Sequence, residues 1–378
     1  MLRLVCRTAP VAILILALII PAGPAQAARC KQNQDKLGLM IGQMLMFGFY
    51  GTKPGHKGPQ AIARHLCNGT IGGVFMLGHN VKGSDQVKAL TALYRGAGAK
   101  VTPFIAIDHE GGMVQRLGRK LGYQSIPRPS TVAAKYSTKQ ARQLYRKAAA
   151  QVRGAGFNLN FAPVVDVNVN PRNPAIGKLG RSFSAKPQTV IDYARAFIAA
   201  HHSKGVLTVL KHFPGHGSSQ SDSHDGFVDI SGSWKKNTEL SPFKALGNDQ
   251  DYGDMIMVGH LYHSGLSPKG QVPATISYQA ITGLLRGQLG YQGVVITDDL
   301  EMAAIRKNFG FRNAVIRAIN AGNDILMISN SAKPDLKLAD KVVAMIKKAI
   351  SKGQIKRARI EQSYNRIRNL KNKLERLE

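Results

Sequence analysis

The alternation of short apolar runs with longer amphipathic stretches constrains the fold of this chain more than any other feature. Eight short runs have the length and the apolar content of buried strands. They are Met44–Phe49, Thr70–Leu77, Pro103–Asp108, Asn158–Val165, Val206–Lys211, Met255–His260, Gly293–Asp298 and Asp324–Ile328. Stretches of helical length separate these runs, and helical crossovers join strands that run parallel. The pattern therefore predicts an α/β fold, a single-domain (β/α)8 TIM-type barrel.

Helical periodicity fills several of the intervals between the runs. The clearest stretches are Asp85–Ala97, Thr131–Arg153, Pro187–Lys204, Tyr278–Leu289 and Phe311–Ala321. Some of them end beside a glycine, such as Gly154, Gly205 or Gly322, as helices commonly do. Residues 337–376 alternate basic with apolar side chains at helical spacing, which predicts C-terminal helices with a solvated basic face.

Polar residues at the ends of the runs favour a closed barrel over an open doubly wound sheet, which is the alternative. They follow five of the runs: Asp108, Asp166, Lys211 with His212, His260 and Asp298. In a barrel the C-terminal strand ends converge on one site, whereas an open sheet spreads them along its edge. No glycine-rich phosphate-binding fingerprint follows any run, so the sequence predicts no nucleotide cofactor.

The first 27 residues have the features of a secretory signal peptide. Arg3 and Arg7 precede the unbroken apolar run Val11–Ile20, and the small-residue pattern Ala25-Gln26-Ala27 follows it. The run is shorter than the roughly 20 residues that span a bilayer, so cleavage is predicted after Ala27 rather than membrane anchoring. We therefore expect a periplasmic or secreted protein whose catalytic barrel occupies residues 28–378.

Two cysteines, Cys30 and Cys67, remain after the predicted cleavage. An even pair in an oxidising compartment favours a disulfide. The alternative is two separate thiols, with Cys67 buried in a helix near Ala61–Leu66. A lipid anchor on Cys30 is not expected, because Arg29 occupies the place of the small residue that would precede it.

The formal net charge is +30, from 52 Lys and Arg against 22 Asp and Glu. Such a surface attracts polyanions. No recognisable nucleic-acid-binding module is present, and an exported protein does not meet nucleic acid in the cell, so no nucleic-acid partner is predicted. Anionic envelope polymers or membrane surfaces fit the charge better.

One loop concentrates catalytic residue types. Lys211-His212-Phe213-Pro214-Gly215-His216-Gly217 follows an apolar run, and Asp222-Ser223-His224 comes shortly after. Proline and glycine force the chain out of regular structure there. Asp222 and His224 can hydrogen-bond, the carboxylate orienting the imidazole for acid/base chemistry. The alternative is a turn whose histidines only pack or face water.

Asp298 and Asp299 end the apolar run that begins at Gly293. A buried strand that delivers a carboxylate to a barrel mouth holds a nucleophile rigidly. The alternative makes Asp298 a helix cap for a segment beginning near Leu300, a role that suits Asp299 better.

A second polar cluster is Asp108-His109-Glu110-Gly111-Gly112 with Arg116. Paired glycines let backbone approach a ligand, while Asp108 and Arg116 can bind hydroxyl groups. Arg181, in a long loop after the fourth run, is a candidate substrate clamp or a plain surface arginine. His109-Glu110 lacks the second histidine of a zinc motif, so no metal is predicted.

Four segments together resemble the signature regions of family 3 glycoside hydrolases, specifically the β-N-acetylhexosaminidase branch. They are Val101–Leu117, Phe161–Ser184, Lys211–His224 and Val294–Met302. The loop from Lys211 with its Asp-x-His ending is specific to that branch, whereas the Asp-x-Glu-Gly-Gly and Asp-Asp-Leu-x-Met segments are shared more widely.

The resemblance implies a retaining enzyme that releases terminal β-linked N-acetylglucosamine from peptidoglycan fragments or chitin-type oligosaccharides. It implies that Asp298 attacks the anomeric carbon, while His224, oriented by Asp222, protonates the leaving oxygen and then activates water. Retaining enzymes more often use two carboxylates. A neutral imidazole repels an anion less than a carboxylate does, so phosphate is an alternative acceptor. The residues implied to hold the sugar are Asp108, Arg116, Arg181, Lys211 and His212.

The sequence departs from the usual family pattern at three places. His109 stands where glutamine is common, Met113 stands where arginine is common, and two extra residues separate Gly177 from Arg181. None of these touches the implied nucleophile or the Asp222/His224 pair. The insertion leaves the role of Arg181 less certain than that of Arg116.

Two other functions compete with this prediction. A family 3 β-glucosidase is the close alternative, although the single-domain length and the Asp-x-His loop argue against it. A catalytically silent wall-binding barrel is the alternative from another class, and it has no need of Asp298, Asp222 and His224 together. Similar enzymes of Gram-negative bacteria act in the cytoplasm, which the signal peptide contradicts. A monomer that acts on carbohydrate is expected.

Overall fold

Eight parallel strands form one sheet that closes on itself. The computed structural model describes residue 30 and residues 35–267, 270–331 and 333–377, so the predicted signal peptide lies outside the described residues. The strand order is β11-β9-β7-β6-β3-β2-β1-β12, so the last strand of the chain pairs with the first. A bridge from Ile296 to Ile325 joins β11 to β12 and completes the ring. The barrel prediction is confirmed and the open sheet is excluded.

Each of the eight predicted runs contains or overlaps one barrel strand. The barrel strands are β1 (Leu45–Phe47), β2 (Gly73–Met76), β3 (Phe104–Ile107), β6 (Leu159–Asn160), β7 (Leu207–Phe213), β9 (Met255–Val258), β11 (Val294–Thr297) and β12 (Leu326–Ile328). Short pairs lie outside the barrel sheet: β4 (His109–Gly111) with β5 (Val114–Gln115), and β8 (Val228–Asp229) with β10 (Leu261–Tyr262).

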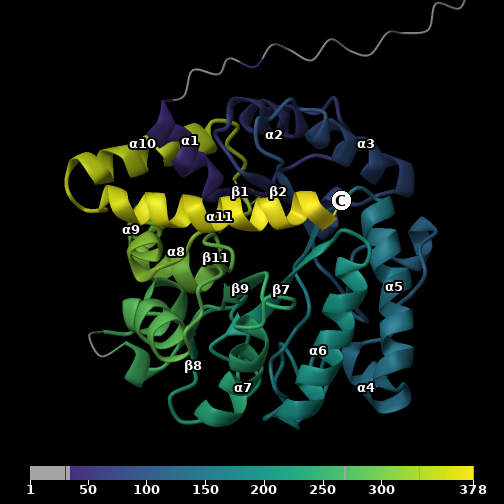
Figure 1. Cartoon of the computed structure of the whole chain (residues 1–378). Coiled ribbons are helices and arrows are strands. Elements are labelled where there is room, and N and C mark those ends of the chain that lie inside the picture. The colour runs from purple at the N-terminus through teal and green to yellow at the C-terminus, as the bar shows by residue number, and fades with distance from the viewer. Residues whose placement is uncertain (1–29, 31–34, 268–269, 332, 378) are drawn as a thin grey trace, which may run out of the picture.

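Helices surround the barrel on its outside (Figure 1). They are α1 (Lys36–Gln43), α2 (Lys57–Asn68), α3 (Ser84–Arg95), α4 (Pro129–Lys135), α5 (Thr138–Gly154), α6 (Pro187–His202), α7 (Lys236–Gly247), the π-helix η5 (Gln279–Gln288), α8 (Ala303–Phe309), α9 (Phe311–Ala321), α10 (Leu338–Ser351) and α11 (Arg357–Leu377). Short 3-10 helices among the described residues are η1 (Gly78–Asn80), η2 (Arg119–Leu121), η3 (Ser264–Leu266) and η4 (Ala274–Ile276). None of the described helices combines the length and apolar character needed to cross a membrane.

The stretch predicted as one helix, Thr131–Arg153, is two helices. Ser137 begins a new helix there, because its side chain accepts a hydrogen bond from the Gln140 N–H (3.3 Å) and Gln140 Oε1 accepts from the Ser137 N–H (2.9 Å). Such a capping box satisfies N–H groups that a helix start otherwise leaves unpaired. The prediction of a continuous helix was therefore wrong at this point.

Buried apolar side chains fill both the barrel interior and the space between strands and helices. The strand residues are almost all inaccessible to solvent, among them Ile105, Ile256 and Ile296. The predicted disulfide between Cys30 and Cys67 is present, with the two Cα atoms 5.4 Å apart. It ties the segment before α1 to the C-terminal turn of α2.

Helix α11 covers the N-terminal end of the barrel. Lys371 is buried and donates to Gln43 Oε1 (2.8 Å) and to the Gly72 carbonyl (2.7 Å), just before β1 and β2. Lys373 pairs with Asp254, just before β9 (2.9 Å). The predicted C-terminal helices thus form part of the domain, and several of their basic residues are engaged with the barrel rather than solvated.

A buried carboxylate, Asp324, holds α11 against the seam between β11 and β12. It pairs with Arg286 (2.6 Å), Arg359 (3.0 Å) and Arg366 (3.3 Å) and also accepts hydrogen bonds from Ser363 Oγ and the Val295 N–H. Burial alone would raise the pKa of Asp324, but the arginines outweigh it and hold the pKa below its ordinary value.

We predict that Asp324→Asn lowers the free energy of unfolding by about 3–5 kcal/mol, because a neutral amide leaves the arginines without their counter-charge. Urea unfolding of the purified protein measures the difference. Glu361→Gln is the control, since it breaks an exposed pair with Arg357 and should cost about 0.5 kcal/mol or less. Similar losses in the two variants would show that the Asp324 cluster does not hold the seam.

Candidate active site

The C-terminal strand ends bring most of the predicted site residues to one mouth of the barrel. Asp108 follows β3, Lys211 and His212 belong to β7, and Asp298 follows β11. Strand β7 lies between β6 and β9, so Lys211 and His212 are flanked by the strands that precede Asp166 and His260.

A network of buried charges fills one side of this mouth. Lys211 Nζ lies 2.8 Å from Asp108 Oδ1 and 2.8 Å from Glu110 Oε1. Arg181 holds the same Glu110 through two bonds, Nε to Oε2 (2.9 Å) and Nη2 to Oε1 (2.8 Å). Burial of Glu110 would raise its pKa, yet Arg181 and Lys211 hold it well below the usual range. Glu110 is therefore an anion that fixes two cations.

Arg181 is nearly inaccessible, at 8% exposure, so it is not a plain surface arginine. Its Nη1 donates to the Ala175 carbonyl (2.9 Å), in addition to the two bonds to Glu110. Direct contact of Arg181 with a sugar stays a prediction. Sequence reasoning gave Glu110 no role. The signal that could have identified it is its position three residues after β3 ends, directly before two glycines.

His212 is held by a buried aspartate. Its Nδ1 lies 2.7 Å from Asp166 Oδ2, and its backbone N–H donates to Asp166 Oδ1 (3.1 Å). The same Oδ1 accepts from the His216 N–H (2.8 Å). Because Asp166 holds Nδ1, the ring of His212 has a fixed orientation. An imidazole that contacts a ligand through Nε2 needs such an orientation.

Asp298 lies at the end of β11, where one hydrogen bond holds its backbone and another holds its side chain. Its N–H donates to the Val258 carbonyl (3.0 Å), and its Oδ1 accepts from the Asp299 N–H (2.8 Å). Burial would raise the pKa of Asp298, but the nearby imidazoles of His260, His212 and His224 outweigh it, so the pKa lies below its ordinary value. The side chain is an ionised carboxylate at neutral pH, the state that a nucleophile requires.

Asp299 does not cap a helix, contrary to the sequence prediction. Its Oδ1 accepts from the N–H groups of Ser329 (2.9 Å) and Glu301 (3.1 Å), which joins β11 to the segment after β12. Helix α8 begins later, at Ala303, and Met302 precedes it without a side-chain cap. Burial raises the pKa of Asp299 to about 6.

Asp222 and His224 form the predicted pair on the surface of the mouth. Asp222 Oδ1 lies 2.7 Å from His224 Nδ1 and accepts the His224 N–H at 3.0 Å. The His224 side chain is 66% exposed, whereas that of Asp222 is 24% exposed. Nε2 of His224 has no hydrogen-bond partner among the described residues, so it is available to a bound molecule.

Arg116 stands apart from the charge network. Its guanidinium lies beside Gly78, in the segment after β2, and makes no ion pair among the described residues. Its Nε is buried and unpaired within the described part of the chain. An arginine in this state at a barrel mouth has donors available for a hydroxylated ligand.

The departures from the family pattern leave this geometry intact. His109 is buried, and burial lowers its pKa to about 4. Met113 is 72% exposed at the mouth side of β5. Despite the two extra residues before it, Arg181 still reaches Glu110.

Glu239, which sequence reasoning missed, supports the buried part of the loop that runs from Lys211 to His224. Its Oε2 accepts from the Ser218 N–H (3.2 Å) and its Oε1 from the Lys235 N–H (3.1 Å). Gly215, with φ of +128°, packs directly on this side chain, so no larger residue fits there. Burial raises the pKa of Glu239 to about 7. A lone glutamate one turn into a helix gave no signal of this contact.

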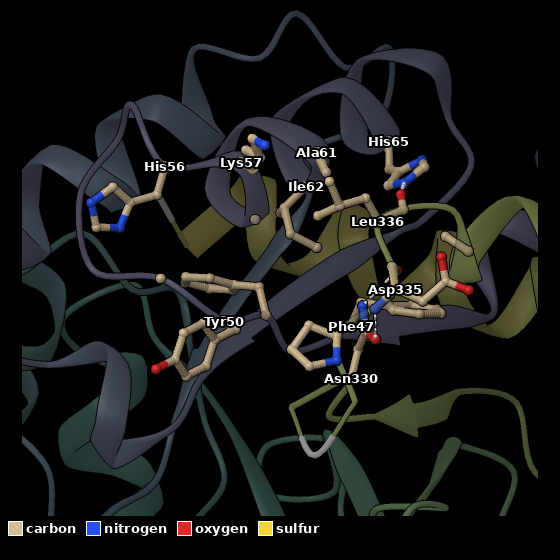
Figure 2. A pocket seen from close by; sticks show the side chains of 15 residues that line it. Phe47, Tyr50, His56, Lys57, Ala61, Ile62, His65, Asn330, Asp335 and Leu336 are labelled. Carbon is tan, nitrogen blue, oxygen red and sulfur yellow. Dashed lines mark hydrogen bonds between the residues drawn. The ribbon is translucent and has the colours of Figure 1, made fainter.

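An apolar pocket beside helix α2 contains none of the predicted site residues. Figure 2 shows it below helix α2, with Tyr50 and His56 on one side and Phe47, Asn330 and Asp335 on the other. It measures ≈ 330 Å³. In the described part of the chain, no three His, Cys, Asp or Glu side chains are grouped to hold a metal ion.

Comparison with known proteins identifies the family. Residues 36–370 match the sequence model described as "Glycosyl hydrolase family 3 N terminal domain". The chain therefore belongs to glycosyl hydrolase family 3.

Particular relatives agree with this assignment. The chain is 35% identical over 342 residues to β-hexosaminidase A of Pseudoalteromonas piscicida, covering 84% of this chain and 56% of that protein. It is 35% identical over 319 residues to β-hexosaminidase LpqI of Mycobacterium tuberculosis, covering 81% of this chain and 77% of that protein. The chain thus spans little more than half the length of the first of these relatives.

Solved structures share the fold. A family 3 β-N-acetylglucosaminidase from Paenibacillus sp. superposes with a TM-score of 0.80 at 31% identity, over 90% of this chain and 63% of that one. A β-N-acetylhexosaminidase from Beutenbergia cavernae superposes with a TM-score of 0.79 at 29% identity, over 90% and 99% of the two chains.

We predict that Glu239→Gln changes the pH dependence of stability. With a folded pKa near 7 and an ordinary value of 4.5, the protonated carboxyl stabilises the fold fully below about pH 4.5, and this contribution is lost as pH rises through 7. The advantage of wild type over the variant should therefore shrink by roughly 2–3 kcal/mol between pH 4.5 and 8. Chemical unfolding across this range measures it.

Glu375→Gln, an exposed change on α11, is the control and should track wild type at every pH. Glu239→Gln also replaces one carboxyl oxygen that accepts a hydrogen bond. That loss changes the free energy of unfolding by an amount that does not vary with pH. Parallel profiles for Glu239→Gln and wild type would show that Glu239 is ionised in the folded protein throughout.

Proposed function

We propose that this protein is a retaining β-N-acetylhexosaminidase that releases terminal β-linked N-acetylglucosamine from peptidoglycan fragments or chitin-type oligosaccharides. The observation that carries the proposal is the carboxylate of Asp298 held at the end of β11, together with the hydrogen-bonded Asp222/His224 pair on the loop that follows β7. The relatives, which are named β-hexosaminidases and a β-N-acetylglucosaminidase, support the same activity and sugar.

In the first step, Asp298 attacks the anomeric carbon and forms a glycosyl-enzyme while the bond to the leaving oxygen breaks. His224 donates the proton to that oxygen from Nε2, because Nδ1 is engaged with Asp222. In the second step the neutral imidazole takes a proton from water, which attacks the anomeric carbon and frees Asp298. A single imidazole thus serves as acid and then base.

Positively charged and hydrogen-bonding groups would hold the sugar beside Asp298. Lys211 and His212 are oriented by buried carboxylates, and Asp108 is held by Lys211. Arg116 offers donors that no described residue uses. Arg181 would contact the sugar and also holds Glu110, which fixes Lys211. The prearranged charges need little rearrangement when a hydroxylated ligand binds.

The same site could use another acceptor or another substrate. Phosphate could replace water, because a neutral imidazole repels it less than a second carboxylate would. Hydrolysis of β-glucosides is the second candidate, and side-by-side assays of chromogenic β-N-acetylglucosaminide and β-glucoside discriminate the two. A silent wall-binding barrel would turn over neither.

The proposed setting is the periplasm or the medium, with the protein acting as a monomer after cleavage near Ala27. The signal-like sequence and the disulfide between Cys30 and Cys67 support export, since disulfides persist in oxidising compartments. Anionic envelope polymers are the proposed partners of the basic surface.

We predict that Asp298→Ala abolishes turnover of an aryl β-N-acetylglucosaminide without unfolding the protein, because it removes the nucleophile. Steady-state kinetics and the melting temperature measure the two effects. Asp85→Asn, an exposed carboxylate on α3, is the control and should keep wild-type rates. A slow fluorinated sugar should label a peptide that contains Asp298, and a label on another residue would move the nucleophile.

We predict that His224→Ala slows substrates with poor leaving groups by about 10²–10⁴-fold and aryl glycosides with good leaving groups far less in the first step. Asp222→Asn should act in the same direction more mildly, because only orientation and charge stabilisation are lost. Glycosyl-enzyme should accumulate with the good leaving groups. Equal losses on both substrate kinds, with no accumulation, would make His224 a binding or structural residue.

A further inference from the structure

A long part of the chain contains no acidic residue. Between Glu110 and Asp166, residues 111–165 include ten Lys and Arg and no Asp or Glu. This segment builds the turn after β5, helix α4 and helix α5. The excess of positive charge is therefore concentrated on one part of the surface rather than spread evenly.

Four of these basic residues lie on the exposed side of α5. They are Lys139, Arg142, Arg146 and Lys147, and each is exposed. Lys139, Arg142 and Arg146 recur at intervals of three and four residues, so they share one face, and Lys147 lies next to it. The opposite face, with Tyr145, Ala148 and Val152, is buried, and α5 packs against α6. We call the four the α5 basic face.

The α5 basic face has no counter-charge of its own. None of its four residues forms an ion pair within the described part of the chain, and neither α4 nor α5 contains an acidic residue. Like charges three and four residues apart on a helix repel, and a lysine in the first turn opposes the helix dipole. The arrangement therefore disfavours the helix unless an anion lies along it.

Other basic helices of the protein differ in this respect. On α11, Arg359, Arg366 and Lys373 pair with the buried Asp324 and Asp254. On α10, Lys341 pairs with Asp335, and Lys347 pairs with Asp35. Several cations of these two helices are thus paired, and both helices contain acidic residues, Asp340 on α10 and Glu361 and Glu375 on α11, whereas the α5 basic face has neither.

The α5 basic face is connected to the mouth of the barrel. Arg119, Lys120 and Arg128 are exposed between the mouth and α4, and the Ser130 N–H donates to the carbonyl of Gly180, next to Arg181 (3.1 Å). Figure 1 places α4 and α5 on one flank of the molecule, beside α6. A polymer that runs along this flank would lead toward the mouth.

We propose that the α5 basic face docks a linear, phosphate-bearing glycopolymer of the cell envelope and so holds the barrel mouth close to wall material. From Lys139 to Lys147 the helix rises about 12 Å, enough for two or more successive phosphates of an extended chain. Flexible lysine and arginine side chains without exposed aromatic neighbours suit a polymer that offers charge but no bases to stack. The choice of an envelope polymer rests on the proposed function, whereas the charge pattern does not.

The test compares two fourfold variants of the full chain. The first is Lys139→Gln/Arg142→Gln/Arg146→Gln/Lys147→Gln. The control removes the same charge from exposed lysines elsewhere, as Lys341→Gln/Lys348→Gln/Lys352→Gln/Lys356→Gln. Binding of poly(glycerol phosphate), duplex DNA and phosphatidylglycerol vesicles is measured across a salt series, together with melting temperature and turnover of an aryl β-N-acetylglucosaminide.

We expect the first variant to lose at least tenfold in affinity for poly(glycerol phosphate), while the control stays within about twofold. The salt slope of the first variant should fall by about 3, since each contacted phosphate of a single strand contributes about 0.7. Turnover should match wild type in both variants, because none of the changed residues lies in the site. The melting temperature of the first variant should be equal to or slightly above that of wild type, because the repulsion along α5 is removed.

Three results would overturn the proposal. Unchanged binding by the first variant removes the α5 basic face from the contact. Equal losses in the two variants show diffuse charge rather than a docking surface. Tighter binding of DNA or vesicles than of the polymer, with the same sensitivity to the first variant, assigns the face to another partner class. Absence of turnover in wild type, with polymer binding as expected, would reject the proposed hydrolase while keeping the docking surface.

Discussion

The seam between β11 and β12 is the contact on which the rest of the structure depends. Backbone hydrogen bonds around the bridge from Ile296 to Ile325 join these strands, and side chains add to the closure. Thr297 Oγ1 accepts from the Met327 N–H (2.9 Å), and Asp299 accepts from the Ser329 N–H (2.9 Å). At the lower end Asp324 ties the seam to α11. Because Asp298 lies between Thr297 and Asp299, the groups that close the barrel also position the proposed nucleophile.

Across the mouth from this seam, buried charged residues hold one another in position. Glu110 lies between Arg181 and Lys211, and Lys211 reaches on to Asp108. Burial would lower the pKa of Lys211, but Asp108 and Glu110 outweigh it and raise the pKa above its ordinary value. The ammonium is therefore charged and held in place. Buried ions of this kind are stable only as a complete set, because an unpaired buried charge is strongly unfavourable.

The loop from Lys211 to His224 is buried where it leaves β7 and exposed at its other end. Asp166 and Glu239 hold its backbone at His212, His216 and Ser218, inside the protein. Its far end carries the Asp222/His224 pair, where only Asp222 is partly covered. Because the buried part of the loop is fixed, the loop keeps its position at the mouth. The exposed imidazole of His224 can contact leaving groups of different size. The α5 basic face adds a second level, because it would bring polymeric material to the same mouth.

The sequence by itself determined the barrel, because eight apolar runs separated by helical stretches can satisfy their backbone hydrogen bonds in few ways. It also indicated Asp298, Asp222 and His224, since local order along a strand end or a short loop is enough to place them. Tertiary structure alone decided the partners of Glu110, Glu239 and Asp324, each of which meets residues far away in the chain. It likewise turned Asp299 from an expected helix cap into a link across the seam. Local pattern fixes which side chains end a strand, but only the closed barrel fixes which of them become buried together.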